Sequence, residues 1–112
     1  QAGNAQMLFG EGRRDVSRWA SQRPLLHDPG TTWNYTSAGT LLISDALTRV
    51  VAADARDPAA RRAAMRQWMN ASLFDRIGMR ALWEYDPRGV FYGSSLLWAT
   101  ARDYAKFGYL YL

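Results

Sequence analysis

A Pro-Gly pair at residues 29 and 30 constrains this chain most, because it separates two segments of helical periodicity. Pro and Gly in succession interrupt regular structure and mark a turn or loop. Before them, apolar residues recur at helical spacing within residues 13–22, and Pro24 ends that pattern. The sequence therefore predicts a helix over residues 13–22, a loop over 25–34, and a longer helix after the loop.

The helix that follows the loop has the clearest pattern in the chain. Thr36 or Ser37 can act as its N-cap, because a hydroxyl oxygen accepts a hydrogen bond from the first turn. We expect one face to be buried, since it is apolar at Leu42, Ile43, Ala46, Leu47, Val50 and Val51. We expect the opposite face, which carries Ser44, Asp45, Thr48 and Arg49, to be exposed to solvent.

Two more helices have recognisable start signals. Asp57 followed by Pro58 is an N-cap with proline at the first helical position, and the helix is predicted to run to about residue 70. Thr100 and Asp103 form a capping box, with Asp in place of the usual Glu, so a last helix is predicted from there to the end.

Turn-forming residues at 86–89 predict the only β structure. Short strands are expected on either side, at residues 82–83 and 90–92. The predicted fold class is therefore mainly α with at most a small β-hairpin. With 112 residues, of which 48% are apolar, the chain is expected to form at most one domain with a packed core.

Composition excludes several classes of function. Without Cys there is no disulfide, thiolate zinc site or cysteine nucleophile. The net charge is +4, but the basic residues are scattered among acidic ones, so nucleic-acid binding is not expected. No apolar run reaches the roughly 18 residues of a membrane span. His27 has no other metal ligand nearby in the sequence, and neither a metal nor an organic cofactor is expected.

The chain stops inside an aromatic, apolar segment at residues 107–112, whereas natural termini are usually polar. We therefore expect it to be a piece of a longer protein. The first residues show no signal peptide, and a chain without Cys is compatible with any redox environment. The localisation is therefore not assigned.

Three segments, in this order, resemble a known family. The first is Pro29-Gly30-Thr31-Thr32-Trp33-Asn34-Tyr35-Thr36-Ser37. The second is Leu73-Phe74-x-x-Ile77-Gly78-Met79. The third runs from Gly93-Ser94-Ser95 to Ala99-Thr100-Ala101-Arg102-Asp103-Tyr104-Ala105-Lys106-Phe107-Gly108. Together they make residues 11–112 resemble the serine β-lactamase and penicillin-binding-protein superfamily, most closely its esterase-like and 6-aminohexanoate-dimer-hydrolase-like branch.

This resemblance implies an α+β fold with the active site between a helical subdomain and an antiparallel sheet. Residues 1–112 would be the central helical part. The implied reaction cleaves a small ester or amide substrate through an acyl-enzyme, with Tyr35 as the proton-shuttling base beside a Ser-x-x-Lys pair. Neither Ser-x-x-Lys nor the family's Lys-Thr-Gly-like strand occurs here. The chain alone is therefore expected to be inactive, with the remainder of its own domain as its partner.

The resemblance also implies substrate-binding roles for Trp33, Ser37, Gly93, Ser94 and Ser95. Ser37 takes the third place of the Tyr-x-Asn/Ser motif, where Ser fits the esterase and amide-hydrolase branch better than the β-lactamases. Several aromatic side chains could shape the substrate pocket: Trp33, Trp83, Tyr85, Phe91, Tyr92 and Trp98. Of these, Trp33 and Tyr92 are expected nearest to the cleft.

Other interpretations use the same residues. Tyr35 could be a half-buried aromatic at the start of a helix, Ser37 a helix cap, and residues 93–95 a turn. The Gly-Ser-Ser segment partly matches the nucleophile elbow of α/β-hydrolases, but it lacks the final Gly, and His27 lies upstream of it. The chain as a whole could be a non-enzymatic helical module that binds a partner through an aromatic face.

Overall fold

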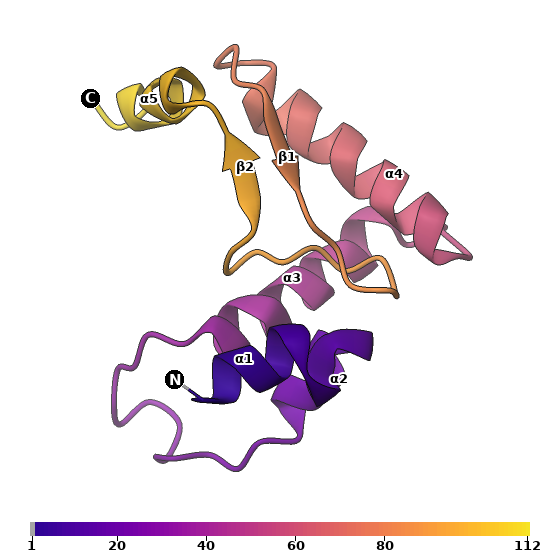
Figure 1. The fold of residues 1–112 in the computed structure, drawn as a ribbon, viewed down its shortest axis with the longest axis vertical. Helices are drawn as coiled ribbons and strands as arrows, with labels where there is room; N and C mark the ends of the chain where they lie inside the picture. The colour runs from indigo at the N-terminus through magenta and orange to yellow at the C-terminus, as the bar shows by residue number, and fades with distance from the viewer. Residues whose placement is uncertain (1) are drawn as a thin grey trace.

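The computed structural model describes residues 2–112, which form a mainly helical molecule with a two-stranded antiparallel sheet. Its elements are α1 (Ala2–Phe9), η1 (Glu11–Arg14), α2 (Val16–Ser21), α3 (Ser37–Val51), α4 (Pro58–Met69), η2 (Asn70–Phe74), β1 (Ala81–Trp83), β2 (Leu97–Ala99) and α5 (Ala101–Tyr109). Figure 1 shows α1 and α2 beside α3 at one end of the molecule, and the two strands between α4 and α5 at the other.

Side-chain caps begin four of the helices, which is why they start where they do. In α2, α3, α4 and α5 the cap accepts a hydrogen bond from the backbone N–H three residues on, and the caps are Asp15, Thr36, Asp57 and Thr100. The predicted starts of the last three helices are thereby confirmed, with Thr36 rather than Ser37 as the α3 cap. The predicted helix at 13–22 is shorter, because η1 occupies its first residues. Helix α1 was not predicted.

The main core lies where α1 and α2 meet α3. Met7, Val16, Ala20 and Leu41 are buried there, and Tyr92, in the segment after the hairpin turn, packs against them. Gly12 is needed at this junction, since a Cβ atom there would overlap the backbone of Met7. The core therefore joins the N-terminal helices to the start of α3 and to the segment after the hairpin turn.

The predicted orientation of α3 is wrong. Its buried stripe is Leu41, Ser44 and Thr48, whereas Ile43 is 69% exposed and Val50 is 76% exposed. The two buried hydroxyls are satisfied within the helix, because each donates to the carbonyl oxygen four residues earlier, at 3.0 Å for Ser44 and 2.7 Å for Thr48. Because these side chains are small and hydrogen-bonded within their own helix, neighbouring segments can pack closely against them. The helix therefore buries its polar side and leaves much of its apolar side exposed to solvent.

The hairpin is partly as predicted. Residues 82–83 lie in β1, but their regular partner is β2, with Leu82 opposite Trp98. The predicted second strand at 90–92 contributes only a single bridge between Tyr85 and Phe91. The strand pairing resumes after a bulging segment that contains Gly93, Ser94 and Ser95.

The turn at 86–89 joins three parts of the molecule. Asp86 is buried and its carboxylate accepts hydrogen bonds from the backbone N–H groups of Val16, Arg88 and Val90. Arg88 pairs with Asp15, the α2 cap, at 2.6 Å. Gly89 has φ +87°, and a Cβ atom there would overlap the Pro58 carbonyl of α4. This turn therefore fixes the hairpin against both α2 and α4.

The predicted helix α4 is confirmed, with Met65 fully buried on its inner side. Residues 52–57 connect α3 to α4, and Ala52 in this connection is buried. The longest helix in the described part of the chain has 15 residues, and none there combines the length and hydropathy needed to cross a bilayer.

Candidate functional site

The start of α3 presents two aromatic side chains to solvent. Tyr35 is 73% exposed and Trp33 is 86% exposed, and both precede the cap residue Thr36. Their loop bends at Gly30, which has φ +79°, and Thr31 closes that bend by donating its hydroxyl hydrogen to the Asp28 carbonyl oxygen. Tyr35 is therefore not the half-buried aromatic of the alternative interpretation, and its phenol is open to a partner group.

Ser37 is the first residue of α3 and is half-buried. The capping hydrogen bond at this end is made by Thr36, whose Oγ1 accepts from the Gly39 N–H at 3.0 Å. The N-cap of α3 is therefore Thr36, and Ser37 is not the helix cap of the alternative interpretation. Ser37 follows Tyr35 by two residues, across the boundary between extended backbone and helix.

The Gly-Ser-Ser segment packs against the same helix. A Cβ atom at Gly93 would overlap the Ser44 Oγ and would also touch Thr40, so the backbone at residue 93 lies directly on α3. Ser44 is seven residues beyond Ser37, which is about 10 Å along the helix axis. The predicted site residues at the start of α3 and those of the Gly-Ser-Ser segment therefore lie beside the same helix, about two turns apart.

A pocket of about 510 Å³ lies between the end of α4, η2, the two strands and α5. Gly93, Ser94 and Ser95 form part of its wall, whereas Trp33, Tyr35 and Ser37 do not. Among the aromatic residues expected to shape a pocket, Trp83, Phe91 and Tyr92 line this one. The predicted site residues are thus divided between an exposed helix start and an apolar pocket.

Three residues that line the pocket each carry a polar atom that is sealed from solvent and has no hydrogen-bond partner among residues 2–112. These atoms are the Trp83 indole Nε1 and the hydroxyl oxygens of Ser94 and Ser95. An unsatisfied buried donor or acceptor costs about 1–3 kcal/mol. Three of them in one wall are unusual, because buried polar groups are nearly always hydrogen-bonded.

The backbone next to these serines is strained. Leu96 has φ +60°, and among residues 2–112 it is the one non-glycine residue with a positive φ. Such a conformation costs of order 1 kcal/mol or more and persists where its surroundings enforce it. Here the flanking hydrogen bonds do so: the Ser95 N–H donates to the Tyr92 carbonyl, and the Leu96 carbonyl accepts from the Glu84 N–H.

Charged groups surround the pocket but do not line it. Burial raises the pKa of the Tyr92 phenol, and the negative charges of Asp86 and Glu84 raise it further. Tyr104, on α5, donates its hydroxyl hydrogen to the Leu97 carbonyl at 2.7 Å, so its polar end is already paired. None of the described residues that form the wall is charged. The pocket is therefore a neutral, mostly apolar environment.

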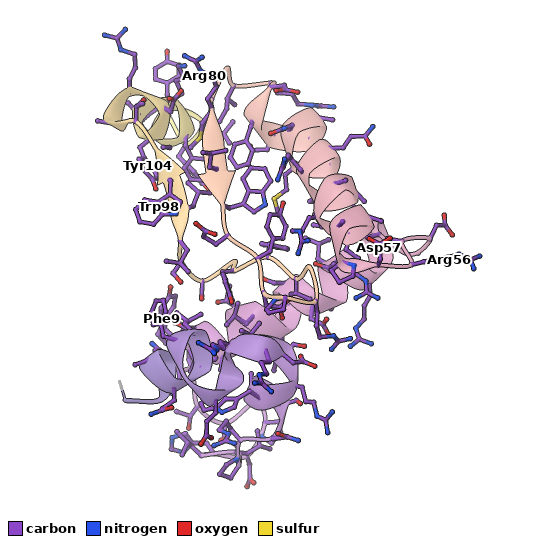
Figure 2. The ribbon with its side chains drawn as sticks, turned by 45° about the vertical axis from the view of Figure 1, so that its right-hand side comes forward. Phe9, Arg56, Asp57, Arg80, Trp98 and Tyr104 are labelled. Atoms are coloured by element: carbon purple, nitrogen blue, oxygen red, sulfur yellow. The ribbon has the colours of Figure 1, made fainter. Side chains whose placement is uncertain are left out.

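Nine of the fifteen residues that line this pocket were not predicted from the sequence. Trp68, Ser72, Tyr104 and Phe107 line it as well, from α4, η2 and α5. Nothing in the local sequence marks them as a group, because they converge only where α4, η2 and α5 pack around the strands. Figure 2 shows Tyr104 near Trp98 on the side of β2 away from α4. Trp98 itself does not line the pocket and is 58% exposed.

His27 is exposed on the loop before α3, and no group of three or more potential metal-ligating side chains occurs among residues 2–112. Comparisons of the chain with protein-family models, with curated proteins and with solved structures gave no significant match.

Proposed function

We propose that this chain is part of a serine hydrolase related to the β-lactamases that cleaves ester or amide bonds through an acyl-enzyme. Tyr35 is its proton-shuttling base. The nucleophilic serine and the cationic lysine come from a Ser-x-x-Lys segment outside these 112 residues. Residues 93–95, Trp33 and Ser37 contribute to the substrate cleft.

The observation that supports this proposal most is the exposure of Tyr35. A base must come within about 2.6–3.2 Å of the hydroxyl whose proton it takes. A phenol that is 73% exposed at the start of a capped helix can be reached by a serine from another segment, whereas a buried phenol could not. The order of the three sequence segments supplies the second line of support.

In this mechanism Tyr35 accepts the proton of the serine hydroxyl as that oxygen attacks the carbonyl carbon. The lysine ammonium lies beside the phenol and favours its charged form. Tyr35 then returns the proton to the leaving group, and backbone N–H groups stabilise the oxyanion. Water finally hydrolyses the acyl-enzyme. No metal enters any step.

Two experiments test the proposal. The first is to read the coding sequence upstream, where a Ser-x-x-Lys is expected roughly 50 to 70 residues before Tyr35, a spacing taken from the family resemblance. Its absence would remove the nucleophile and overturn the assignment. The second is hydrolysis of a nitrophenyl ester by the 112-residue chain alone. Turnover by that chain would contradict the placement of the nucleophile outside it.

A specific observation favours one other function, that of a non-enzymatic interaction module. The exposed side of α3 carries Ile43 and Val50, which are 69% and 76% exposed. Apolar side chains that face solvent along one helix are typical of a surface that meets a protein partner. If Ile43→Ser and Val50→Ser together abolish a partner interaction while esterase activity is absent from any longer form, the module is favoured.

A further inference from the structure

A second groove, away from the predicted site residues, lies between the segment that follows η2 and one side of α5. Its volume of about 620 Å³ is within the range of small-molecule sites. Three cations line it, Arg76, Arg102 and Lys106, and no acidic side chain does so among residues 2–112. Most of the remaining wall is apolar and includes Ile77 and Ala105. The groove therefore combines positive charge with an apolar surface.

The fold leaves two of these three cations without an acidic partner. Lys106 is neutralised within α5, because its Nζ lies 3.0 Å from a carboxylate oxygen of Asp103 and also donates to the Gly78 carbonyl. Arg76 donates its Nε–H to a backbone carbonyl at 3.1 Å. Neither Arg76 nor Arg102 forms an ion pair with residues 2–112. The groove thus presents two guanidinium groups whose charge no described carboxylate balances.

The position of Arg102 gives the helix no stability. Arg102 is the second residue of α5 and is exposed, so its charge lies at the positive end of the helix dipole. Negative charge is favourable there and positive charge is not. Because the guanidinium is also unpaired, nothing in the described fold accounts for it, and an anion held in the groove would compensate its charge.

We propose that this groove binds a small phosphate monoester with an apolar body. A guanidinium holds a phosphate through parallel N–H···O hydrogen bonds. Two unbalanced guanidinium groups match the charge of about −1.5 to −2 that a phosphate monoester carries at neutral pH, whereas a single carboxylate would leave one of them unbalanced. The body of the ligand lies against Ile77, Ala105 and Leu110. Tyr35 has no part in this binding, so the proposal stands or falls separately from the hydrolase function.

Four compounds separate the charge of the ligand from its apolar body. Hexyl phosphate has both, hexyl sulfate has the same body with a single charge, inorganic phosphate has no body, and hexanol has no charge. Each is titrated at pH 8 into the 112-residue chain, and the backbone N–H signals of residues 76–77 and 102–110 are followed by ¹H–¹⁵N NMR. We expect hexyl phosphate to bind most tightly and to shift these signals. Added sodium chloride should weaken its binding, because salt screens exposed charges.

Three variants assign the contacts, and a fourth is their control. Arg76→Gln and Arg102→Gln should each weaken binding of hexyl phosphate by about 2–5-fold, the value of one exposed ion pair. Arg56→Gln makes the same change in net charge and should leave binding unchanged. Arg56 is also exposed and without an ion pair among residues 2–112, and Figure 2 shows it on the opposite side of the molecule from α5.

The third variant, Ala105→Glu, places a carboxylate inside the groove and should weaken binding at least as much as either arginine change. Its carboxylate lies three residues after Arg102 and can pair with it, so the urea midpoint of unfolding should be kept or raised. Loss of binding in this variant therefore cannot be attributed to loss of the fold.

Several outcomes would overturn the proposal. Equal weakening by Arg56→Gln would mean that hexyl phosphate responds to the net charge of the chain and not to the groove. Equal binding of hexyl sulfate would contradict the match to two charges, and equal binding of inorganic phosphate would show that the apolar wall contributes nothing. If hexyl phosphate does not bind, the proposal is wrong. Binding to phosphatidylglycerol vesicles that Arg102→Gln weakens would then assign the groove to a lipid surface.

Discussion

Gly93 lies so close to Ser44 that a Cβ atom at position 93 would overlap the Ser44 hydroxyl oxygen. This contact joins the Gly-Ser-Ser segment to the buried stripe of α3, the helix that begins two residues after Tyr35. It is possible because both positions carry minimal side chains. The same contact explains why α3 turns its small polar residues inward, and it fixes the wall of the pocket relative to the start of the helix.

Gly93→Ala is therefore expected to lower the free energy of unfolding by about 1–3 kcal/mol, the usual cost of overpacking. Urea unfolding measures the change. Gly108→Ala is the matched control, because Gly108 is in α5 and a Cβ atom there meets no other atom within 4 Å. It should be neutral or stabilising by up to about 1 kcal/mol. Adding Ser44→Ala to Gly93→Ala should recover part of the loss, and full additivity of the two would argue against the contact.

Asp103 is expected to make stability fall in acid. Hydrogen bonds from the Thr100 hydroxyl, from Lys106 and from the Arg80 backbone N–H hold the pKa of its carboxyl well below the usual value. The folded chain then binds this proton less readily than the unfolded chain, so the stabilisation is present above pH 4 and is lost as the pH falls. The difference in urea midpoint between the native chain and Asp103→Asn should shrink from pH 6 to pH 3. A constant difference would contradict the assignment.

Asp86 is expected to make stability fall as the pH rises, the opposite of the effect of Asp103. Burial raises the pKa of its carboxyl and outweighs the hydrogen bonds from Val90, Val16 and Arg88. The folded chain holds this proton more tightly than the unfolded chain, so the contribution to stability is complete below about pH 4 and declines as the pH rises through the raised pKa. Relative to Asp86→Asn, the native chain should lose stability from pH 3 to pH 6. The opposite slope would show that the hydrogen bonds prevail over burial.

The helix starts could be predicted from the sequence because caps act locally. Thr36, Asp57 and Thr100 each satisfy a backbone N–H three residues ahead, and that geometry depends on a few adjacent residues. The turn at residues 86–89 was predictable for the same reason. These signals need no knowledge of what the rest of the chain does.

The buried face of α3 and the partner of β1 could not be predicted in this way. Apolar periodicity indicates which residues would prefer burial, but Gly93 packs on Ser44, and this contact between distant residues brings the polar side inward. Likewise β1 pairs with residues 97–99, because residues 93–95 lie outside the ladder, between the hydrogen bonds that Glu84 makes with Tyr92 and with Leu96. Ser94 and Ser95 could be singled out from the local Gly-Ser-Ser motif, whereas nothing local indicates that Trp83 packs in the same region, since it lies on a separate strand.

The hydrolase proposal makes its sharpest prediction at Tyr35. In a protein that joins this chain to its Ser-x-x-Lys segment, Tyr35→Phe should reduce kcat for a nitrophenyl ester by about 10²-fold or more, because the proton transfer loses its base. Stability should change by less than about 0.5 kcal/mol, since the side chain is mostly exposed. Tyr109→Phe removes a similarly exposed hydroxyl from the end of α5 and should leave kcat unchanged. An active Tyr35→Phe enzyme would show that another group takes the serine proton.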